Sequence, residues 1–434
     1  MTSIHNKMNH GQRETADRIS AKKMTYDVVV IGGGAAGMFA AIHAAKNGLR
    51  VLLIEKNDRL GKKLLITGKG RCNVTNACAP EDVLKNVPGN PRFLYSAVYG
   101  FPPEQTMAFF EENGCALKVE RGNRVFPVSD RSADILAVLE RGLKQYGVTR
   151  RQETAAGLFV QDGKLAGIKT DRGIISCDCA ILCTGGKSYP LTGSTGDGYR
   201  LAASVGHSIT EPTGSLVPLE SNVDCAEMQG LSLRNTELKM IDGKGKTVFR
   251  DFGELLFTHF GISGPMALSA SAHRKAGESY RIVLDLKPAL DEAKLDARFL
   301  RDFEKYANRS MENALADLYP HSMIPVLLRR CGIDASMQAN SLTKQQRRAL
   351  LEQTKRFEIP VTGVRPVEEA IITRGGISVK EVDPKTMQSK LVSGLYFAGE
   401  ILDCDAYTGG FNLQIAWSTA YAAAKACAES LSNI

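Results

Sequence analysis

The alternation of apolar and polar residues near the start of the chain predicts a strand, a turn, a helix and a second strand. Residues 28–31 (Val-Val-Val-Ile) form an apolar run of the kind found in strands buried on both faces. Small and apolar residues then predict a helix over 35–46, which Asn47-Gly48 ends, and residues 50–54 predict the second strand. This order is typical of a βαβ unit in a parallel sheet.

The middle of the chain changes from a strand-like to a helix-like pattern. Residues 147–183 predict strands, with a hairpin turn at 162–164. Residues 215–286 predict short alternating strands of a small β-barrel or sandwich. Residues 288–358 are rich in Leu, Ala, Lys, Arg and Glu at helical spacing, so we expect a helical insertion there.

The last part of the chain returns to strands and a helix. Strands are predicted at 357–359 and 371–382. Residues 394–400 predict a further buried strand, and residues 412–431 predict a long helix of small residues. Because this ending is typical of a doubly wound sheet, we expect the N-terminal domain to be discontinuous, with the β and helical parts inserted in it.

The turn after the first strand is suited to binding a nucleotide. Gly32, Gly34 and Gly37 occupy the three glycine positions of a G-x-G-x-x-G turn. The first makes the tight turn, the second lets the backbone approach a pyrophosphate, and the third lets the helix pack on the strand. The first amides of that helix point at the phosphates. Glu55 follows the second strand and can accept hydrogen bonds from ribose hydroxyls, whereas it would repel a 2′-phosphate, so FAD or NAD is predicted here.

Three further segments can be assembled round one extended cofactor. Residues 68–76 contain glycines that permit close approach, and Arg71 can offset pyrophosphate charge, although it could equally form a surface ion pair. Glu400 directly follows a buried strand and is expected beside the ribityl or pyrophosphate region. The amides of residues 409–412 can bond the pyrimidine edge of a flavin, or the loop can simply begin a packing helix. Together these segments favour FAD.

Composition, charge and cysteine spacing argue against several other classes of protein. The 434 residues carry a formal charge of +8 without an aromatic-interleaved basic patch, so no nucleic-acid partner is expected. No apolar run approaches the roughly 18 residues that span a bilayer, so no membrane insertion is expected. Residues 1–23 are polar, lack the apolar core of a secretory signal and are expected to be disordered. Ten cysteines include no Cys-x-x-Cys pair, so we predict no redox dithiol and no metal site, and a cytoplasmic location.

Five segments of the chain carry family motifs. They are Gly-Lys-Gly-Arg-Cys-Asn-Val-Thr-Asn (68–76), Thr-Gly-Ser-Thr-Gly-Asp-Gly-Tyr (192–199), Leu-Phe-Thr-His-Phe-Gly-Ile-Ser-Gly-Pro (256–265), Thr-Arg-Gly-Gly (373–376) and Gly-Leu-Tyr-Phe-Ala-Gly-Glu…Gly-Gly-Phe-Asn-Leu-Gln (394–414). These segments resemble the bacterial BaiN/YhiN-like flavoproteins, and the resemblance runs from Tyr26 to the C-terminus. The FAD domain of that family is similar to those of fumarate reductases and ketosteroid dehydrogenases.

The resemblance implies an α/β fold: a discontinuous Rossmann-like FAD-binding domain with an inserted β-barrel domain and a helical domain. The expected boundaries are 24–212 and 362–434 for the FAD-binding domain, 213–287 and 345–361 for the β-barrel domain, and 288–344 for the helical domain. The expected FAD contacts, from the motifs and the resemblance together, are Gly32, Gly34, Ala35, Ala36, Gly37, Glu55, Lys56, Gly70, Arg71, Asn73, Thr184, Gly185, Gly399, Glu400, Gly410, Asn412 and Leu413.

A flavin held in this way transfers hydride or single electrons, while the protein supplies orientation and a proton donor or acceptor. We expect an FAD-dependent reductase or dehydrogenase that acts on a small, activated organic substrate. A second dinucleotide fingerprint is absent, so NADH or NADPH would dock only transiently as electron donor. Relatives linked by name to bile-acid enone reduction and to aminoacetone oxidation leave the substrate open. The alternatives are an oxidase that passes electrons to oxygen, and a flavin-binding scaffold or RNA-associated protein without turnover of its own.

Three residues are candidate acid or base groups. His259 lies in a Thr-His-Phe-Gly turn, Tyr407 precedes the flavin-edge loop, and Arg374 lies beside two glycines. His259 could instead be satisfied by the backbone of a hairpin, and Tyr407 could belong to the core. Asp403 and Asp405 flank the same loop and either tune it or face solvent. The sequence leaves the oligomeric state open.

Overall fold

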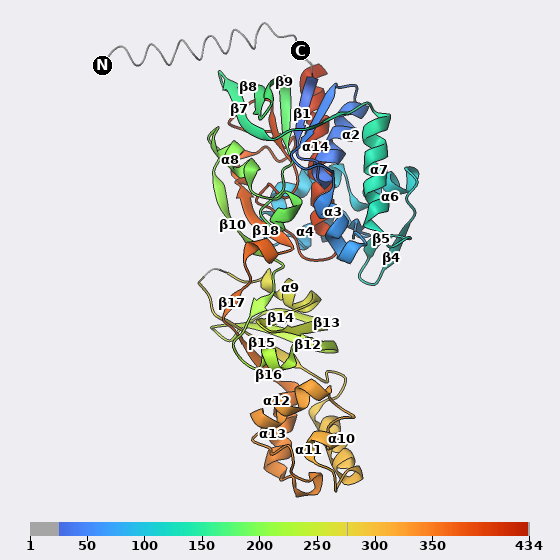
Figure 1. The fold of residues 1–434 in the computed structure, drawn as a ribbon, viewed down its shortest axis with the longest axis vertical. Coiled ribbons are helices and arrows are strands. Elements are labelled where there is room, and N and C mark those ends of the chain that lie inside the picture. The colour runs from blue at the N-terminus through green and yellow to red at the C-terminus, as the bar shows by residue number, and fades with distance from the viewer. Residues whose placement is uncertain (1–25, 276, 433–434) are drawn as a thin grey trace, which may run out of the picture. The chain divides into compact units, whose positions relative to one another are not determined.

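The computed structural model describes residues 26–275 and 277–432, which form two compact units (Figure 1). The first unit runs to Thr213 and resumes at Ile372, and the second spans Gly214–Ile371. The extension expected to be disordered, residues 1–23, lies outside the described residues. The second unit is therefore inserted in the first, whose two parts are brought together by the sheet described next.

A mixed seven-stranded sheet forms the centre of the first unit. Its strands, in order of pairing, are β6 (Thr149–Gln152), β2 (Val51–Glu55), β1 (Tyr26–Ile31), β9 (Gly173–Leu182), β8 (Lys164–Thr170) and β7 (Ala155–Gln161), and β19 (Leu395–Phe397) also pairs with β9. Strands β6, β2, β1, β9 and β19 are parallel, whereas β8 and β7 are antiparallel. Val28, Val29 and Val30 are completely buried, as expected for a parallel strand covered on both faces.

Helices cover this sheet and include those predicted over 35–46 and 412–431. Helix α2 (Ala35–Lys46) packs against α14 (Phe411–Ser432), where Phe39 and Trp417 meet with ring centroids 5.2 Å apart. Alanines on α14 are buried and allow this close packing. The other helices of the unit are α3 (Lys62–Ile66), α4 (Pro80–Lys85), α5 (Tyr95–Gly100), α6 (Pro103–Glu112), α7 (Ser132–Gln145) and α8 (Asp197–Ala203).

Two small sheets complete the first unit. One contains β3 (Thr75–Asn76), β5 (Arg124–Pro127) and β4 (Leu117–Glu120), and the other pairs β10 (Ile209–Ser215) with β18 (Ile372–Ile377). The strand predicted over 371–382 was too long, because it ends at Ile377. Residues Val379–Glu381 form a short 3₁₀ turn instead, in which the amide of Glu381 donates to the carbonyl of Ser378.

The second unit combines a seven-stranded antiparallel sheet with short helices. Its strands, in order of pairing, are β16 (Phe357–Val361), β15 (Tyr280–Asp285), β12 (Ser232–Asp242), β13 (Thr247–Thr258), β14 (Gly261–Ser263), β11 (Leu219–Glu220) and β17 (Gly363–Val364). The end strands β16 and β17 are separated only by Thr362, so the sheet curves back on itself. This order agrees with the expected β-barrel, which stays a prediction.

The predicted helical insertion forms part of the second unit. Its helices are α10 (Glu292–Lys305), α11 (Met311–Ala314), α12 (Ile324–Arg330) and α13 (Lys344–Lys355), and α9 (Pro265–Ser271) lies nearer the sheet (Figure 1). One apolar cluster joins sheet and helices, with Leu295, Phe299 and Leu350 fully buried beside sheet residues such as Ile282. Among the described residues, no helix has the length and hydropathy to cross a membrane.

Candidate functional site

The predicted cofactor residues meet at the carboxyl edge of the parallel strands. Strand β1 leads into the turn at Gly32, β2 ends at Glu55, β9 leads into Thr184, and β19 leads towards Glu400. The chain reaches β2 on one side of β1 and β9 on the other, which makes this edge a topological switch point. Open α/β sheets bind their ligands at such points.

The glycine-rich turn has the close contacts that its motif predicts. Gly32 has φ +104°, and a Cβ atom there would lie 2.6 Å from the carbonyl oxygen of Cys183. A Cβ atom on Gly37 would lie 1.8 Å from the carbonyl oxygen of Gly32. Both positions therefore require glycine for the packing of α2 on the sheet.

Gly34 differs from these two glycines because it faces open space. A Cβ atom on Gly34 would meet no atom within 4 Å, and the backbone there is extended, with φ −81°. Gly34 is the N-cap of α2, so Ala35 and Ala36 are the first residues of the helix, and their amides have no partner within it. This glycine serves no packing purpose, and the open space in front of helix amides suits a pyrophosphate.

Glu55 is a buried carboxylate held by three N–H groups. Oε2 accepts a hydrogen bond of 2.7 Å from the amide of Gly33. Oε1 accepts bonds of 2.8 Å and 2.7 Å from the backbone and side-chain amides of Asn57. Only 9% of Glu55 is exposed. The acid is therefore fixed at the end of β2, where a ribose would lie in a dinucleotide fold.

Residues 56 and 57 tie this strand end to the loop before α8. The side-chain amide of Asn57 also donates to the carbonyl of Thr192, over 3.2 Å. The Lys56 amine lies 2.6 Å from Asp197 Oδ2 and 2.5 Å from Thr195 Oγ1. Lys56, predicted as an FAD contact, thus directs its amine at Asp197 and Thr195 in this structure.

Glu400 forms the centre of a second polar cluster. Its carboxylate accepts hydrogen bonds from the Lys63 amine at 2.6 Å and 2.9 Å, from Ser188 Oγ at 3.0 Å, and from the amide of Thr373 at 2.9 Å. The hydroxyl oxygen of Thr373 in turn accepts bonds from the amides of Lys187 and Ser188. Glu400, which was predicted beside the ribityl or pyrophosphate region of FAD, therefore also links segments that are far apart in the sequence.

The start of α14 packs against Thr75, near the end of the segment 68–76. Gly410 has φ +99°, and a Cβ atom there would lie 2.3 Å from the carbonyl oxygen of Thr75. Asn412 braces the preceding loop, because its side chain accepts from the amide of Ala406 at 2.8 Å and donates to the Ala406 carbonyl at 2.7 Å. The side chain of Gln414 accepts from Thr75 Oγ1 at 2.6 Å. The expected flavin-edge loop is thus held rigidly.

Two predicted contacts have buried polar atoms that suit a polar ligand. Within residues 26–275 and 277–432, Asn73 Oδ1 and Thr184 Oγ1 are buried without a hydrogen-bond partner. Leaving such an atom unpaired costs about 1–3 kcal/mol, which a cofactor hydroxyl or amide would recover. Together with the open space at Gly34 and the carboxylate of Glu55, these atoms fit FAD.

The remaining predicted contacts lie in the same segments. Arg71 forms ion pairs with Glu120 and Asp130 and lies over the Phe126 ring at 4.1 Å, so it occupies the ion-paired position that the sequence left open. Gly70 ends the 3₁₀ turn Thr67–Gly70 that follows α3, Gly185 and Gly399 lie in the loops after β9 and β19, and Leu413 lies at the start of α14.

Two of the three candidate acid or base groups lie close together. Arg374 Nε is 3.5 Å from Oδ1 of Asp405, whose side chain is only 3% exposed. Burial raises the pKa of Tyr407, the nearby charge of Arg374 opposes that rise, and Asp405 adds to it. The backbone amide of Tyr407 is fixed by the carbonyl of Asn86 at 2.9 Å. This structure therefore assembles a cation, a carboxylate and a phenol beside the loop that begins α14.

His259, the third candidate, belongs to the second unit. It is exposed on the turn between β13 and β14, and its ring lies 5.0 Å from that of Phe260. Thr258 Oγ1 donates a hydrogen bond to the carbonyl of Gly261 across this hairpin, so this bond is made by residues next to His259 in the turn.

Sequence reasoning missed four side chains that order this edge. Asn57, Lys63, Ser188 and Thr373 had no assigned role, although each bonds one of the two predicted acids or their cluster. Asn57 lies two residues after Glu55, and this position could have marked it as a partner of that acid. The partners of Lys63 lie up to 337 residues away, so no local pattern could reveal that contact.

Comparison with known proteins places the chain in a family. Residues 26–426 match the family described as "HI0933-like protein Rossmann domain". A "3-dehydro-bile acid delta(4,6)-reductase" from Clostridium scindens is 32% identical over 412 residues, 92% of this chain and 98% of that protein. Proteins named "Ribosomal RNA dihydrouridine synthase" from Escherichia coli and Haemophilus influenzae are 29% and 30% identical, over 92% and 93% of this chain and 97% and 98% of those proteins.

These findings confirm the predicted family and the predicted α/β, Rossmann-like fold class. The expectation that no nucleic acid takes part stays a prediction, although two of the relatives are named for ribosomal RNA. The chain belongs to the HI0933-like family, and it is an FAD-dependent oxidoreductase.

Proposed function

We propose that this protein reduces a carbon–carbon double bond that is conjugated to a carbonyl group. The name of the Clostridium scindens relative specifies double bonds conjugated to the 3-oxo group of a bile acid. Dihydrouridine, in the names of the other two, is uridine reduced at the ring double bond next to a carbonyl. The substrates differ greatly in size, but the reacting group is the same. This shared group is the observation that carries the proposal.

The reaction adds one hydride and one proton across the double bond. FAD, when bound and reduced, supplies the hydride. The protein has three tasks: to position the enone, to withdraw charge from its carbonyl oxygen, and to deliver a proton to the carbon next to the carbonyl.

The cluster of Arg374, Asp405 and Tyr407 is suited to these tasks. A guanidinium is always charged in proteins, and Asp405 holds that of Arg374 in place at 3.5 Å. A cation in this position stabilises the negative charge that develops on the carbonyl oxygen. Because burial raises the pKa of Tyr407, its phenol stays protonated at neutral pH and can donate the proton. His259 remains a candidate for the same role, and its replacement by Ala tests that role, since a catalytic His259 predicts slower turnover with FAD still bound.

The electron donor and the substrate class form the finer part of the proposal. NADH or NADPH is proposed as a transient donor, because the chain has one dinucleotide fingerprint, which we assign to FAD. A small organic enone is favoured by the 32% identical relative, and ribosomal RNA by the two others.

A cytoplasmic location is also proposed. It is supported by ten cysteines that are all free thiols, three of them on β9 or directly after it.

Product analysis of a single turnover tests the proposal. The protein is reduced with dithionite under argon and mixed either with a 3-oxo-Δ4,6 bile acid or with ribosomal RNA that lacks dihydrouridine. Mass spectrometry should show a gain of two hydrogens in one of the two. No gain in either, together with rapid peroxide formation in air, would instead support the oxidase.

A further inference from the structure

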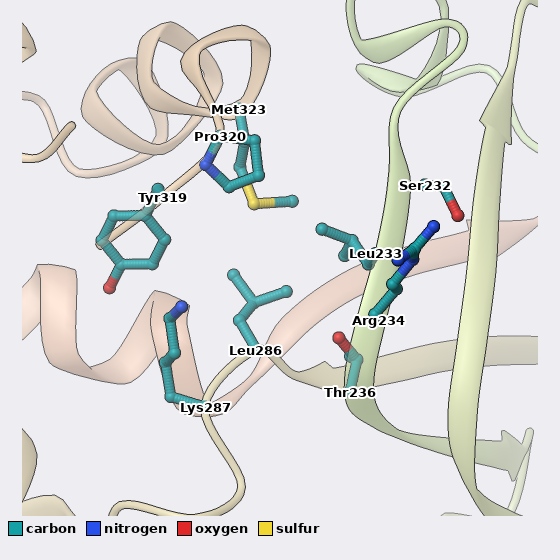
Figure 2. Close-up of a pocket in the computed structure, with 9 residues that line it drawn as sticks. All are labelled: Ser232, Leu233, Arg234, Thr236, Leu286, Lys287, Tyr319, Pro320 and Met323. Atoms are coloured by element: carbon teal, nitrogen blue, oxygen red, sulfur yellow. The ribbon is translucent and has the colours of Figure 1, made fainter. Parts of the chain in front are cut away.

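The second unit contains a cavity of about 220 Å³ that has no part in the proposed reaction (Figure 2). It lies between β12, the segment after β15, and the 3₁₀ turn η5 (His321–Met323) with the residues before it. The lining residues are Ser232, Leu233, Arg234, Thr236, Leu286, Lys287, Tyr319, Pro320 and Met323.

Most of the wall of this cavity is apolar and firmly packed. Leu233, Leu286 and Met323 are 7%, 7% and 0% exposed. Tyr319 is 3% exposed, and its hydroxyl bonds Thr354 Oγ1 at the end away from the cavity, so the ring is held in place. The cavity therefore offers a flat aromatic face and aliphatic side chains to an apolar group.

Lys287 brings a positive charge into this apolar surrounding. Figure 2 shows its amine pointing into the space beside Tyr319, and Nζ lies 5.5 Å from the centre of the Tyr319 ring. The nearest carboxylate along the chain, Asp285, pairs with Lys355 at 2.6 Å. None of the ion pairs found in the described part of the second unit includes Lys287. Burial, with the charge of Arg298 added, lowers the pKa of Lys287.

The opposite wall is shaped by a β-bulge. The pairing of β12 with β13 shifts register between Leu233 and Thr236, and Asn235 has φ +55°, which few residues other than glycine adopt. The bulge places Arg234 on the cavity wall, as Figure 2 shows. Its Nε lies 3.9 Å from Glu254 Oε1, and the side chain is mostly exposed. Bulges commonly redirect side chains at binding sites, so this one adds a second cation at the rim.

We propose that the cavity binds a small organic anion, a carboxylate attached to an aromatic or flat apolar body. The carboxylate would pair with Lys287, and the body would lie against Tyr319, Leu286 and Met323. A half-buried ammonium without a counter-charge is costly, and a bound carboxylate relieves that cost. The volume is below the roughly 300–1,000 Å³ of sites for drug-sized ligands, so the ligand has the size of phenylacetate. The site is independent of the proposed reduction.

Binding of phenylacetate to the FAD-loaded full chain tests this proposal. Calorimetry should show saturable binding of phenylacetate and at least tenfold weaker binding of its neutral analogue, phenylacetamide. The methyl resonance of Met323, assigned with Met323→Leu, should shift in ¹³C NMR spectra as phenylacetate is added. Absence of binding up to 10 mM, or binding without a shift at Met323, would overturn the proposal.

Two substitutions test the charge of Lys287 and the shape of the cavity separately. Lys287→Met keeps the aliphatic stem and should weaken phenylacetate binding at least tenfold, with little change for phenylacetamide. Ser232→Trp narrows the cavity from its exposed rim and should abolish binding of both probes. Lys246→Met, at an exposed turn of the same unit, is the matched control and should change neither. Equal binding by Lys287→Met and the wild type would contradict the assigned role of Lys287.

Discussion

The side-chain amide of Asn57 donates a hydrogen bond of 2.7 Å to Oε1 of Glu55, and its backbone amide donates a second bond of 2.8 Å to the same oxygen. Asn57 therefore fixes the orientation of the acid that we assign to the ribose of FAD. The same side chain reaches the carbonyl of Thr192, so it also couples the acid to the loop before α8. We therefore propose that Asn57 is a positioning residue for the cofactor.

Replacement of Asn57 by Ala should weaken FAD binding about tenfold, the equivalent of roughly 1.4 kcal/mol. The reason is that Glu55 loses one of its three donors and keeps only the backbone amides of residues 33 and 57, so its carboxylate is held less firmly. Flavin fluorescence on titration of the deflavinated protein measures the dissociation constant. Asn308→Ala, at an exposed position of the second unit, should bind FAD as the wild type does. An unchanged dissociation constant for FAD in Asn57→Ala would contradict the positioning role of Asn57.

Gly34 and Gly37 should respond in opposite ways to substitution. A Cβ atom at Gly34 meets no protein atom within 4 Å, so deflavinated Gly34→Leu should melt at the wild-type temperature but fail to bind FAD. Gly37→Ala places a Cβ atom 1.8 Å from the carbonyl oxygen of Gly32, so it should lose about 1–3 kcal/mol or more of unfolding free energy. Circular dichroism melts and flavin absorbance measure both effects. Tight FAD binding by Gly34→Leu would show that the pyrophosphate lies elsewhere.

Tyr407→Phe should slow enone reduction by about 10²-fold or more while FAD stays bound, because a general acid contributes about 10²–10⁴. The raised pKa of Tyr407 keeps the phenol protonated as pH rises, so the wild-type rate should stay level to at least about pH 10, the ordinary pKa of tyrosine. Rapid-mixing measurements across pH test this expectation. A wild-type rate that already falls between pH 6 and 8 would point to a different donor, such as His259.

His43 should make the protein less stable in mild acid. It is buried among aromatic rings, and burial lowers its pKa from 6.5 to about 4. The unfolded state therefore binds the proton first, so stability is complete above pH 6.5 and decreases as pH falls towards 4, by up to about 3 kcal/mol. Urea unfolding at several pH values measures the slope.

The matched variants for this pH effect are His43→Phe and His321→Gln. His43→Phe should flatten the slope, because the aromatic surroundings accept the ring and no proton is taken up. His321 is exposed, so His321→Gln should keep the wild-type slope. The same slope in His43→Phe as in the wild type would assign the acid sensitivity to other groups.

Most of what the sequence could predict came from patterns among residues that are close together along the chain. The helix predicted over 35–46 is α2, and the turn predicted at 162–164 joins β7 to β8, because both depend on neighbours along the chain. The helix α7 was missed, although Ile135, Leu139 and Leu143 have helical spacing and are buried. Its N-cap residue, Arg131, makes no side-chain capping hydrogen bond, and Gly147, which ends the helix with φ +69°, was interpreted as the start of a strand.

Contacts between distant segments could not be predicted. The carboxylate of Glu400 was expected near the cofactor, but its bonds to Lys63 and Ser188 depend on how helix α3 and two loops converge. The ion pairs of Arg71 likewise follow from the position of the β4–β5 hairpin. The sequence could name the acids and glycines of the site, whereas their partners follow from the fold.

The most direct measurement of the central claim is the reoxidation of the reduced flavin by a conjugated ketone. The protein is bleached anaerobically with NADH, NADPH or dithionite, and flavin absorbance near 450 nm is followed after mixing with a 3-oxo-Δ4,6 bile acid, its saturated analogue, or ribosomal RNA without dihydrouridine. Our account predicts rapid return of the absorbance with the bile-acid enone or the RNA, and none with the saturated analogue. A flavin that stays bleached with both unsaturated substrates would contradict it.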